Sequence, residues 1–170
     1  MSTSAAAELT AGFEEPFRAL GRDADRDRDA VVISWPSVPV EIVWAAGLRA
    51  VAARGSAAPT QAADAVLEPE LFPNRLHQLV EAALTGRLAH VAAIVLPRTS
   101  DPDYKCFLYL RELVRRGAAP ALPPVLLFDL LHTDGADAAA YDAARVQDLL
   151  QRLADITGRR SEPADLRSAI

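Results

Sequence analysis

The chain has 170 residues, of which 51% are apolar, and this length and composition suit one domain with a sizeable core. Its net charge of −5 comes without a basic face, which argues against a nucleic-acid partner. No apolar run is long enough to cross a bilayer, no secretory signal pattern opens the chain, and the single cysteine excludes an internal disulfide. We therefore expect a cytoplasmic protein with no membrane contact.

Residues 1–29 predict an N-terminal helical arm followed by a charged linker. The arm has apolar residues at roughly helical spacing: Leu9, Phe13, Phe17 and Leu20. The linker, R-D-A-D-R-D-R-D, begins like a calcium-binding loop but lacks the glycine and the final glutamate of that motif. We expect a solvated segment of alternating charge instead.

Residues 30–170 predict alternating strands and helices. Four short apolar segments predict strands, namely Val31–Trp35, Arg49–Arg54, Val91–Leu96 and Val125–Leu130. Helical patterns lie between Pro39 and Gly47, between Asn74 and Gly86, over Pro102–Arg116 and over Asp137–Thr157, and a further helix begins at Ser161. Residues 55–65 are loop-like, with room for one helical turn. The helix from Pro102 is expected to bury Phe107, Leu110 and Val114.

The alternation of strands and helices indicates right-handed crossovers and therefore a parallel sheet. We predict a single doubly wound α/β domain with a four-stranded parallel sheet in the flavodoxin-like order 2-1-3-4. In that order the topological switch point lies between the first and third strands, where open parallel sheets bind their ligands. The loops at residues 36–38 and 97–101 should then face each other across one crevice.

Polar residues follow both of these strands. Ser37 and Glu41 lie after the first strand, and Thr99, Ser100 and Asp101 lie after the third, so we predict that these five residues bind a ligand. Ser37, Glu41 and Asp101 are the candidates for acid–base catalysis. Asp101 is also the predicted N-cap of the helix from Pro102.

Other polar residues carry weaker signals, and the sequence has no hydrolase, dinucleotide-binding or P-loop motif. His77 and Glu81 are one helical turn apart and could hold a metal, but no third ligand is evident, which favours a solvated polar pair. Asp129, His132 and Asp134 fit acid–base chemistry or a capped turn equally well. We expect His90 to be structural. We expect Cys106 to be a semi-buried, inert thiol despite its neighbour Lys105.

Four segments in order resemble a known family. They are P-V-E-I-V-W-A-A-G (39–47), A-D-A-V-L-E-P-E-L-F-P (63–73), V-L-P-R-T-S-D (95–101) and the closing segment 149–170. Together they resemble the first α/β domain of the 2-hydroxyacyl-CoA dehydratase/benzoyl-CoA reductase family, D-component type, over about residues 30–170. The resemblance implies a heteromeric enzyme with a [4Fe–4S] cluster in each subunit. Such enzymes remove water from 2-hydroxyacyl-CoA esters, or reduce an aromatic acyl-CoA, after activation by an ATP-driven electron donor.

The sequence departs from the family at the cluster ligands. The family supplies cysteines in an F-C-P and a T-C-D motif, whereas this chain has L-F-P with Phe72 and T-S-D with Ser100. The third ligand comes from a second α/β domain, which this sequence does not reach. Because iron–sulfur clusters are held by thiolates, we expect this chain to bind no metal and no cofactor, and a [4Fe–4S] cluster only in a partner subunit.

The resemblance and its departures leave three functional hypotheses. The first is a shortened, cluster-free subunit that helps to bind or dehydrate an acyl thioester together with a larger, cysteine-bearing homologue, and is not catalytic alone. The second is a non-catalytic scaffold or ligand-binding module, and the third is a metal-free acid–base enzyme that uses the same crevice. Apolar surface left uncovered by the missing second domain leads us to expect a heteromer with the larger homologue, or otherwise a homodimer.

Overall fold

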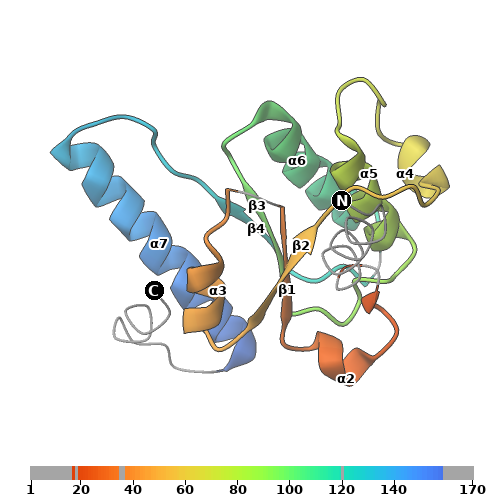
Figure 1. Ribbon diagram of the computed structural model, residues 1–170, viewed down its shortest axis with the longest axis horizontal. Helices are drawn as coiled ribbons and strands as arrows, with labels where there is room; N and C mark the ends of the chain where they lie inside the picture. The colour runs from red at the N-terminus through yellow and green to blue at the C-terminus, as the bar shows by residue number, and fades with distance from the viewer. Residues whose placement is uncertain (1–16, 18, 35–36, 120, 159–170) are drawn as a thin grey trace, which may run out of the picture.

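The computed structural model describes residues 17, 19–34, 37–119 and 121–158, and these form one four-stranded parallel sheet flanked by helices (Figure 1). The strands are β1 (Ala30–Ser34), β2 (Arg49–Ala53), β3 (Ala93–Pro97) and β4 (Val125–Phe128). Their spatial order is β2-β1-β3-β4, and every neighbouring pair is parallel. The predicted fold class and strand order are confirmed.

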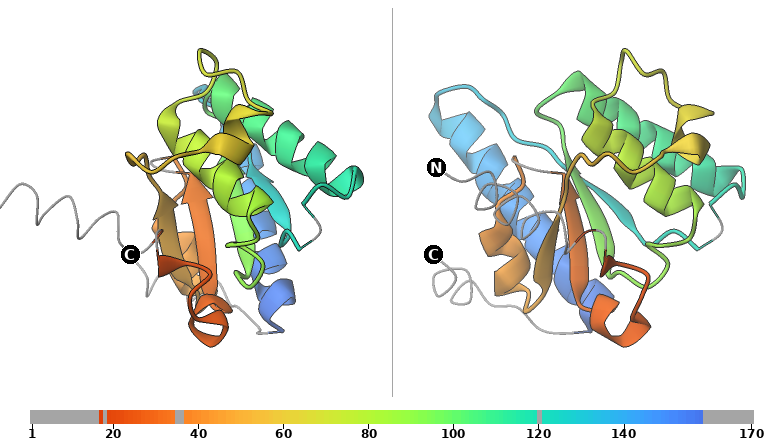
Figure 2. Two further views of the ribbon diagram at one scale, coloured as in Figure 1. Left: turned by 90° about the vertical axis from the view of Figure 1, so that its right-hand side faces the viewer. Right: turned by 45° about the vertical axis from the view of Figure 1, so that its right-hand side comes forward.

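Helices cover both faces of the sheet (Figures 1 and 2). The described helices are α2 (Ala24–Asp27), α3 (Val40–Ala45), α4 (Gln61–Asp64), α5 (Asn74–Leu84), α6 (Asp101–Arg115) and α7 (Ala136–Thr157). α3 and α7 pack on one face, and α5 and α6 on the other, with α4 lying against α5. The single helical turn expected within residues 55–65 is α4.

The central strands β1 and β3 are buried along their whole length, which explains their continuous apolar sequence. Because successive side chains point to opposite faces, Val32 and Ile94 pack under α5 and α6, whereas Val31 and Val95 pack under α3 and α7. The two strands pair in register, with Val32 opposite Ile94. Their carboxyl ends therefore emerge side by side at one edge of the sheet.

Helix α6 differs from the prediction in two details. Its N-cap is Ser100, whose hydroxyl accepts a hydrogen bond from the backbone N–H of Asp103, so Asp101 is the first helical residue and not the cap. Leu113 is buried and Val114 is exposed, which reverses the expected inward position of Val114. The two residues are adjacent, and the helix turns 100° between them, so only contact with the sheet decides which one faces inward.

The charged linker before β1 is more ordered than predicted. Asp23 caps the short helix α2, and the carboxylate of Asp27 is buried and accepts a hydrogen bond from the backbone N–H of Gly21 at 2.7 Å. The expected solvated segment is therefore wrong at Asp27. Of the apolar residues predicted for the N-terminal arm, Phe17 and Leu20 are buried and pack in the core on the α5 and α6 side of the sheet. The part of the arm before Phe17 and the predicted helix from Ser161 lie outside the described residues. Within the described part of the chain, no helix combines the length and apolar character that a membrane crossing needs.

Candidate functional site

The switch point between β1 and β3 brings the two predicted groups of site residues to the same sheet edge. We call Ser37, Glu41, Thr99, Ser100 and Asp101 the switch-point edge. Ser37 follows β1 and Glu41 lies in the first turn of α3, and both are half-buried. Thr99 and Asp101 are exposed on the β3 side. Since β1 and β3 are neighbouring parallel strands, their topology places both groups where ligands bind in such sheets.

Four side chains of the switch-point edge have no hydrogen bond or ion pair with another described residue. They are Ser37, Glu41, Thr99 and Asp101. Their hydroxyl and carboxylate groups can therefore bind a ligand without first breaking an internal contact. Among the described residues, the three candidates for acid–base chemistry form no pair of the nucleophile–base kind.

The fifth member, Ser100, belongs to a buried polar network centred on Asp103. The Asp103 side chain is only 4% exposed and accepts hydrogen bonds from three donors. Ser34, at the end of β1, donates to Oδ1 at 2.5 Å; Ser100 donates to Oδ2; and Arg75, near the start of α5, donates to Oδ2 through Nη2 at 2.7 Å. One carboxylate thus joins β1, α5 and α6 directly beneath the switch-point edge.

The sequence did not predict this network. One local signal was available, because Ser100-Asp101-Pro102-Asp103 follows the pattern of a capping box, in which a serine and an acidic residue three positions later interact. The partners Ser34 and Arg75 carry no such signal. They are 69 and 28 residues away in the sequence and meet Asp103 only through the packing of α5 and α6 on the sheet.

Phe72 is buried between α5 and α6. Its ring packs edge-on against Tyr109 of α6, with ring centroids 5.4 Å apart and an interplanar angle of 71°, and against His77 of α5 at 6.5 Å. Aromatic pairs prefer this edge-to-face geometry. At position 72 the protein therefore presents a packed apolar side chain, and at position 100 it presents a hydroxyl that is engaged with Asp103.

His77 and Glu81 fasten α4 to α5 and are not the solvated pair that the sequence favoured. His77 is buried, and its Nδ1 lies 2.7 Å from Oδ1 of Asp64; this contact, with a hydrogen bond from Thr60, holds the pKa of Asp64 below its usual value. Glu81 accepts a hydrogen bond from the backbone N–H of Ala63 at 2.9 Å. The prediction of a solvated pair was wrong because nothing local in the sequence shows that α4 covers this face of α5.

Asn74 and Gln78 of α5 also form hydrogen bonds with the backbone of the segment that precedes α4. The Asn74 carbonyl oxygen accepts from the backbone N–H of Ser56, and the Gln78 amide donates to the backbone oxygen of Ala58 at 2.7 Å. Asn74, Gln78 and Glu81 are spaced at three and four residues, so they share one face of the helix. This face holds the segment that leads into Phe72.

The remaining candidates take no part in a site with the switch-point edge. Cys106 is fully buried, whereas the sequence predicted a semi-buried thiol. Burial raises the pKa of this thiol far above its usual value, and Lys105 does not activate it. Asp129 pairs with Arg98 at 3.0 Å and accepts a hydrogen bond from Tyr141, whereas His90, His132 and Asp134 are exposed. Within the described ranges, no cluster of three or more His, Cys, Asp or Glu side chains could hold a metal ion.

Comparison with known proteins adds one finding to this geometry. A family model described as 2-hydroxyglutaryl-CoA dehydratase, D-component, matches residues 37–170. The match covers well over half of the chain and includes all five residues of the switch-point edge, as well as Phe72 and Asp103. No curated protein matches the chain.

Proposed function

Because the chain belongs to the 2-hydroxyglutaryl-CoA dehydratase D-component family, we propose that it is a cluster-free subunit of a 2-hydroxyacyl-CoA dehydratase-like complex. In this proposal it helps to bind or dehydrate an acyl thioester, together with a homologous partner that keeps the cluster cysteines. The observation that carries the proposal is the contrast at the switch-point edge. The side chains of Ser37, Glu41, Thr99 and Asp101, which could hold a substrate, have no hydrogen bond or ion pair with another described residue, whereas positions 72 and 100 are committed to internal packing and hydrogen bonding.

The side chains at the two ligand positions do not fit a [4Fe–4S] cluster. A phenyl ring offers no donor atom, and a serine hydroxyl is a poor substitute for a thiolate. The only cysteine, Cys106, is enclosed in the core between α6 and the sheet, and its raised pKa keeps it protonated. These facts support a chain without a cluster, and any cluster chemistry of the complex would belong to the partner.

The chain's own residues would orient the substrate. A 2-hydroxyacyl thioester has a carbonyl oxygen, which accepts hydrogen bonds, and a hydroxyl on the neighbouring carbon, which donates one. Ser37 or Thr99 can donate to the carbonyl, and Glu41 can accept from the substrate hydroxyl. A hydrogen bond to a charged group contributes about 1.5–3 kcal/mol. The reducing cytoplasm is the compartment that suits a partner with an iron–sulfur cluster.

Ligand binding tests the proposal. We expect 2-hydroxyglutaryl-CoA, added to the full chain or to its complex with the cysteine-bearing homologue, to bind in isothermal titration calorimetry. Glu41→Gln should weaken binding about tenfold, which corresponds to about 1.4 kcal/mol. The matched control is Glu70→Gln, which alters an exposed carboxylate in the segment between α4 and α5 and should leave affinity unchanged. Equal affinities for the two variants would refute the assignment of the site.

Metal analysis tests the cluster-free state separately. Protein purified without oxygen should be colourless, and chemical reconstitution should leave no stoichiometric iron or acid-labile sulfide. A stable brown protein would overturn the interpretation of Phe72 and Ser100. If no acyl-CoA binds to the chain or to the complex, the alternative of a non-catalytic scaffold takes its place.

A further inference from the structure

Helix α6 exposes apolar side chains on its outer surface. Leu108 is 41% exposed, whereas the opposite side of the helix is buried through Leu110 and Cys106. Val114 is also exposed but lines a separate depression with Phe107 and Arg111. A large apolar side chain left exposed beside an apolar depression can mark an interaction site, because it gains free energy when another molecule covers it.

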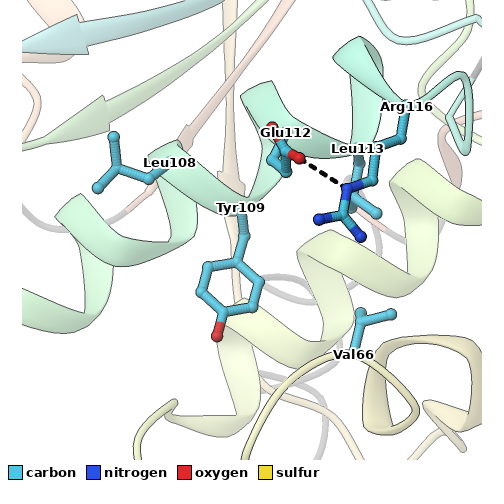
Figure 3. Close-up of a pocket in the computed structure, with 6 residues that line it drawn as sticks. All are labelled: Val66, Leu108, Tyr109, Glu112, Leu113 and Arg116. Carbon is cyan, nitrogen blue, oxygen red and sulfur yellow. Dashed lines mark hydrogen bonds and ion pairs between the residues drawn. The ribbon is translucent and has the colours of Figure 1, made fainter.

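A depression lies beside Leu108, between α6 and the segment that follows α4 (Figure 3). It has a volume of about 510 Å³ and is lined by Val66, Leu108, Tyr109, Glu112, Leu113 and Arg116. The Tyr109 ring extends from α6 toward this segment, and its hydroxyl donates a hydrogen bond to Glu68. The depression therefore offers an apolar wall and is large enough for one or two side chains of another molecule.

This surface of α6 carries mainly positive charges, whereas the chain as a whole is negatively charged. Lys105, Arg111, Arg115 and Arg116 are all exposed on α6, in a protein with a net charge of −5. Glu112 is held by Arg115 and Arg116, each at 2.6 Å, and these contacts lower the pKa of Glu112 to about 2. One carboxylate is shared by two guanidinium groups. Lys105 and Arg111 have no ion pair with a described residue, and the Arg111 guanidinium lies over the Phe107 ring, 5.4 Å from its centroid.

We propose that this surface of α6 docks an acidic amphipathic helix of a partner subunit. Apolar side chains of that helix would enter the depression beside Leu108, and its carboxylates would face Lys105, Arg111 and Arg115. Opposite charges at the rim direct the orientation and speed of association, and the apolar contacts in the centre supply most of the affinity. The inference rests on the proposed function only in that it assumes a partner subunit.

Peptide titration tests the chemistry of the surface. The probe is a synthetic amphipathic helix of about 14 residues with leucine on one face and glutamate on the other, and its control has lysine in place of every glutamate. Two-dimensional NMR of the full ¹⁵N-labelled chain should show that the acidic peptide shifts resonances of α6 and of residues near Val66. Salt should weaken this binding, because screening reduces attraction between exposed charges. The basic peptide should not bind.

Matched variants locate the contact. Leu108→Asp should weaken binding of the acidic peptide at least about tenfold, as expected for an apolar anchor. Leu131→Asp changes a leucine with nearly the same exposure, 43%, in the loop after β4, and should change the affinity by less than about twofold. Arg111→Glu should weaken binding, whereas Arg28→Glu, beside α2, should not.

Three outcomes would overturn the proposal: equal binding of both peptides, shifts that map away from α6, or no binding at millimolar peptide. A parallel measurement of 2-hydroxyglutaryl-CoA binding distinguishes failure of this proposal from failure of the proposed function, since Leu108 lies outside the switch-point edge. A Leu108→Asp variant that still binds 2-hydroxyglutaryl-CoA but not the peptide supports both proposals. A wild-type chain that binds the peptide but no acyl-CoA, alone or in complex, contradicts only the proposed function.

Discussion

Replacement of Asp103 by asparagine should destabilise the fold strongly, because three donors converge on its carboxylate. Ser34, Ser100 and Arg75 all donate to it, and an amide keeps only one accepting oxygen and presents N–H groups where the second oxygen was. Removing one member of a buried ion pair costs about 3–5 kcal/mol. Since the Arg75 side chain is 26% exposed and can be partly hydrated, we expect about 2–4 kcal/mol.

Urea denaturation followed by circular dichroism measures this cost. With a slope of about 2 kcal/mol per molar urea, the midpoint should fall by roughly 1–2 M. Asp101→Asn is the matched control, because it removes the same charge from the same helical turn at an exposed position. The control should cost only about 0.3–1 kcal/mol from the lost interaction with the helix dipole. Equal midpoints for the two variants would refute the assignment of Asp103 as the centre of the network.

Three further predictions concern neighbouring contacts. Phe72→Ala should lower the free energy of unfolding by about 3–5 kcal/mol in urea denaturation, because it leaves a cavity between α5 and α6; a cost below about 1 kcal/mol would show that the ring is not packed there. The contacts from His77 and Thr60 lower the pKa of Asp64 from 3.8, so their stabilisation is present above that value and is lost as the pH falls through the folded-state pKa. Urea midpoints measured across acidic pH should therefore fall less steeply for Asp64→Asn than for the wild type, and parallel curves would contradict this. Because burial raises the pKa of the Cys106 thiol, iodoacetamide should alkylate it only as urea unfolds the chain, and rapid alkylation in buffer would show that the thiol is accessible.

The order of the elements could be predicted because its signals are local. The apolar runs of β1 and β3 predicted strands, which are buried along their whole length, and the glycines after α3 and α5 predicted where those helices end; Gly47 and Gly86 have φ of +70° and +75°. From four strands separated by helices, the parallel sheet and its switch point followed by general rules of connection. The location of the switch-point edge therefore needed no structure.

The contacts beneath that edge could not be predicted in the same way. The sequence suggested that Val114 faces inward and that His77 is solvated, and both inferences failed because burial depends on which neighbour covers a helix face. Periodicity identifies an amphipathic helix but leaves its rotation uncertain by about one residue, or 100°.

The sequence by itself determined the α/β class, the strand order, the family and the absence of cysteine from positions 72 and 100, since each follows from residue identity and local pattern. Only the tertiary structure decided what those positions do instead. It packs Phe72 against Tyr109 and joins Ser100 to Asp103, Ser34 and Arg75. The physical reason is that burial of a charged carboxylate is costly unless hydrogen-bond donors surround it, and folding brings these donors from distant parts of the chain. The most distant donor to Asp103 is 69 residues away.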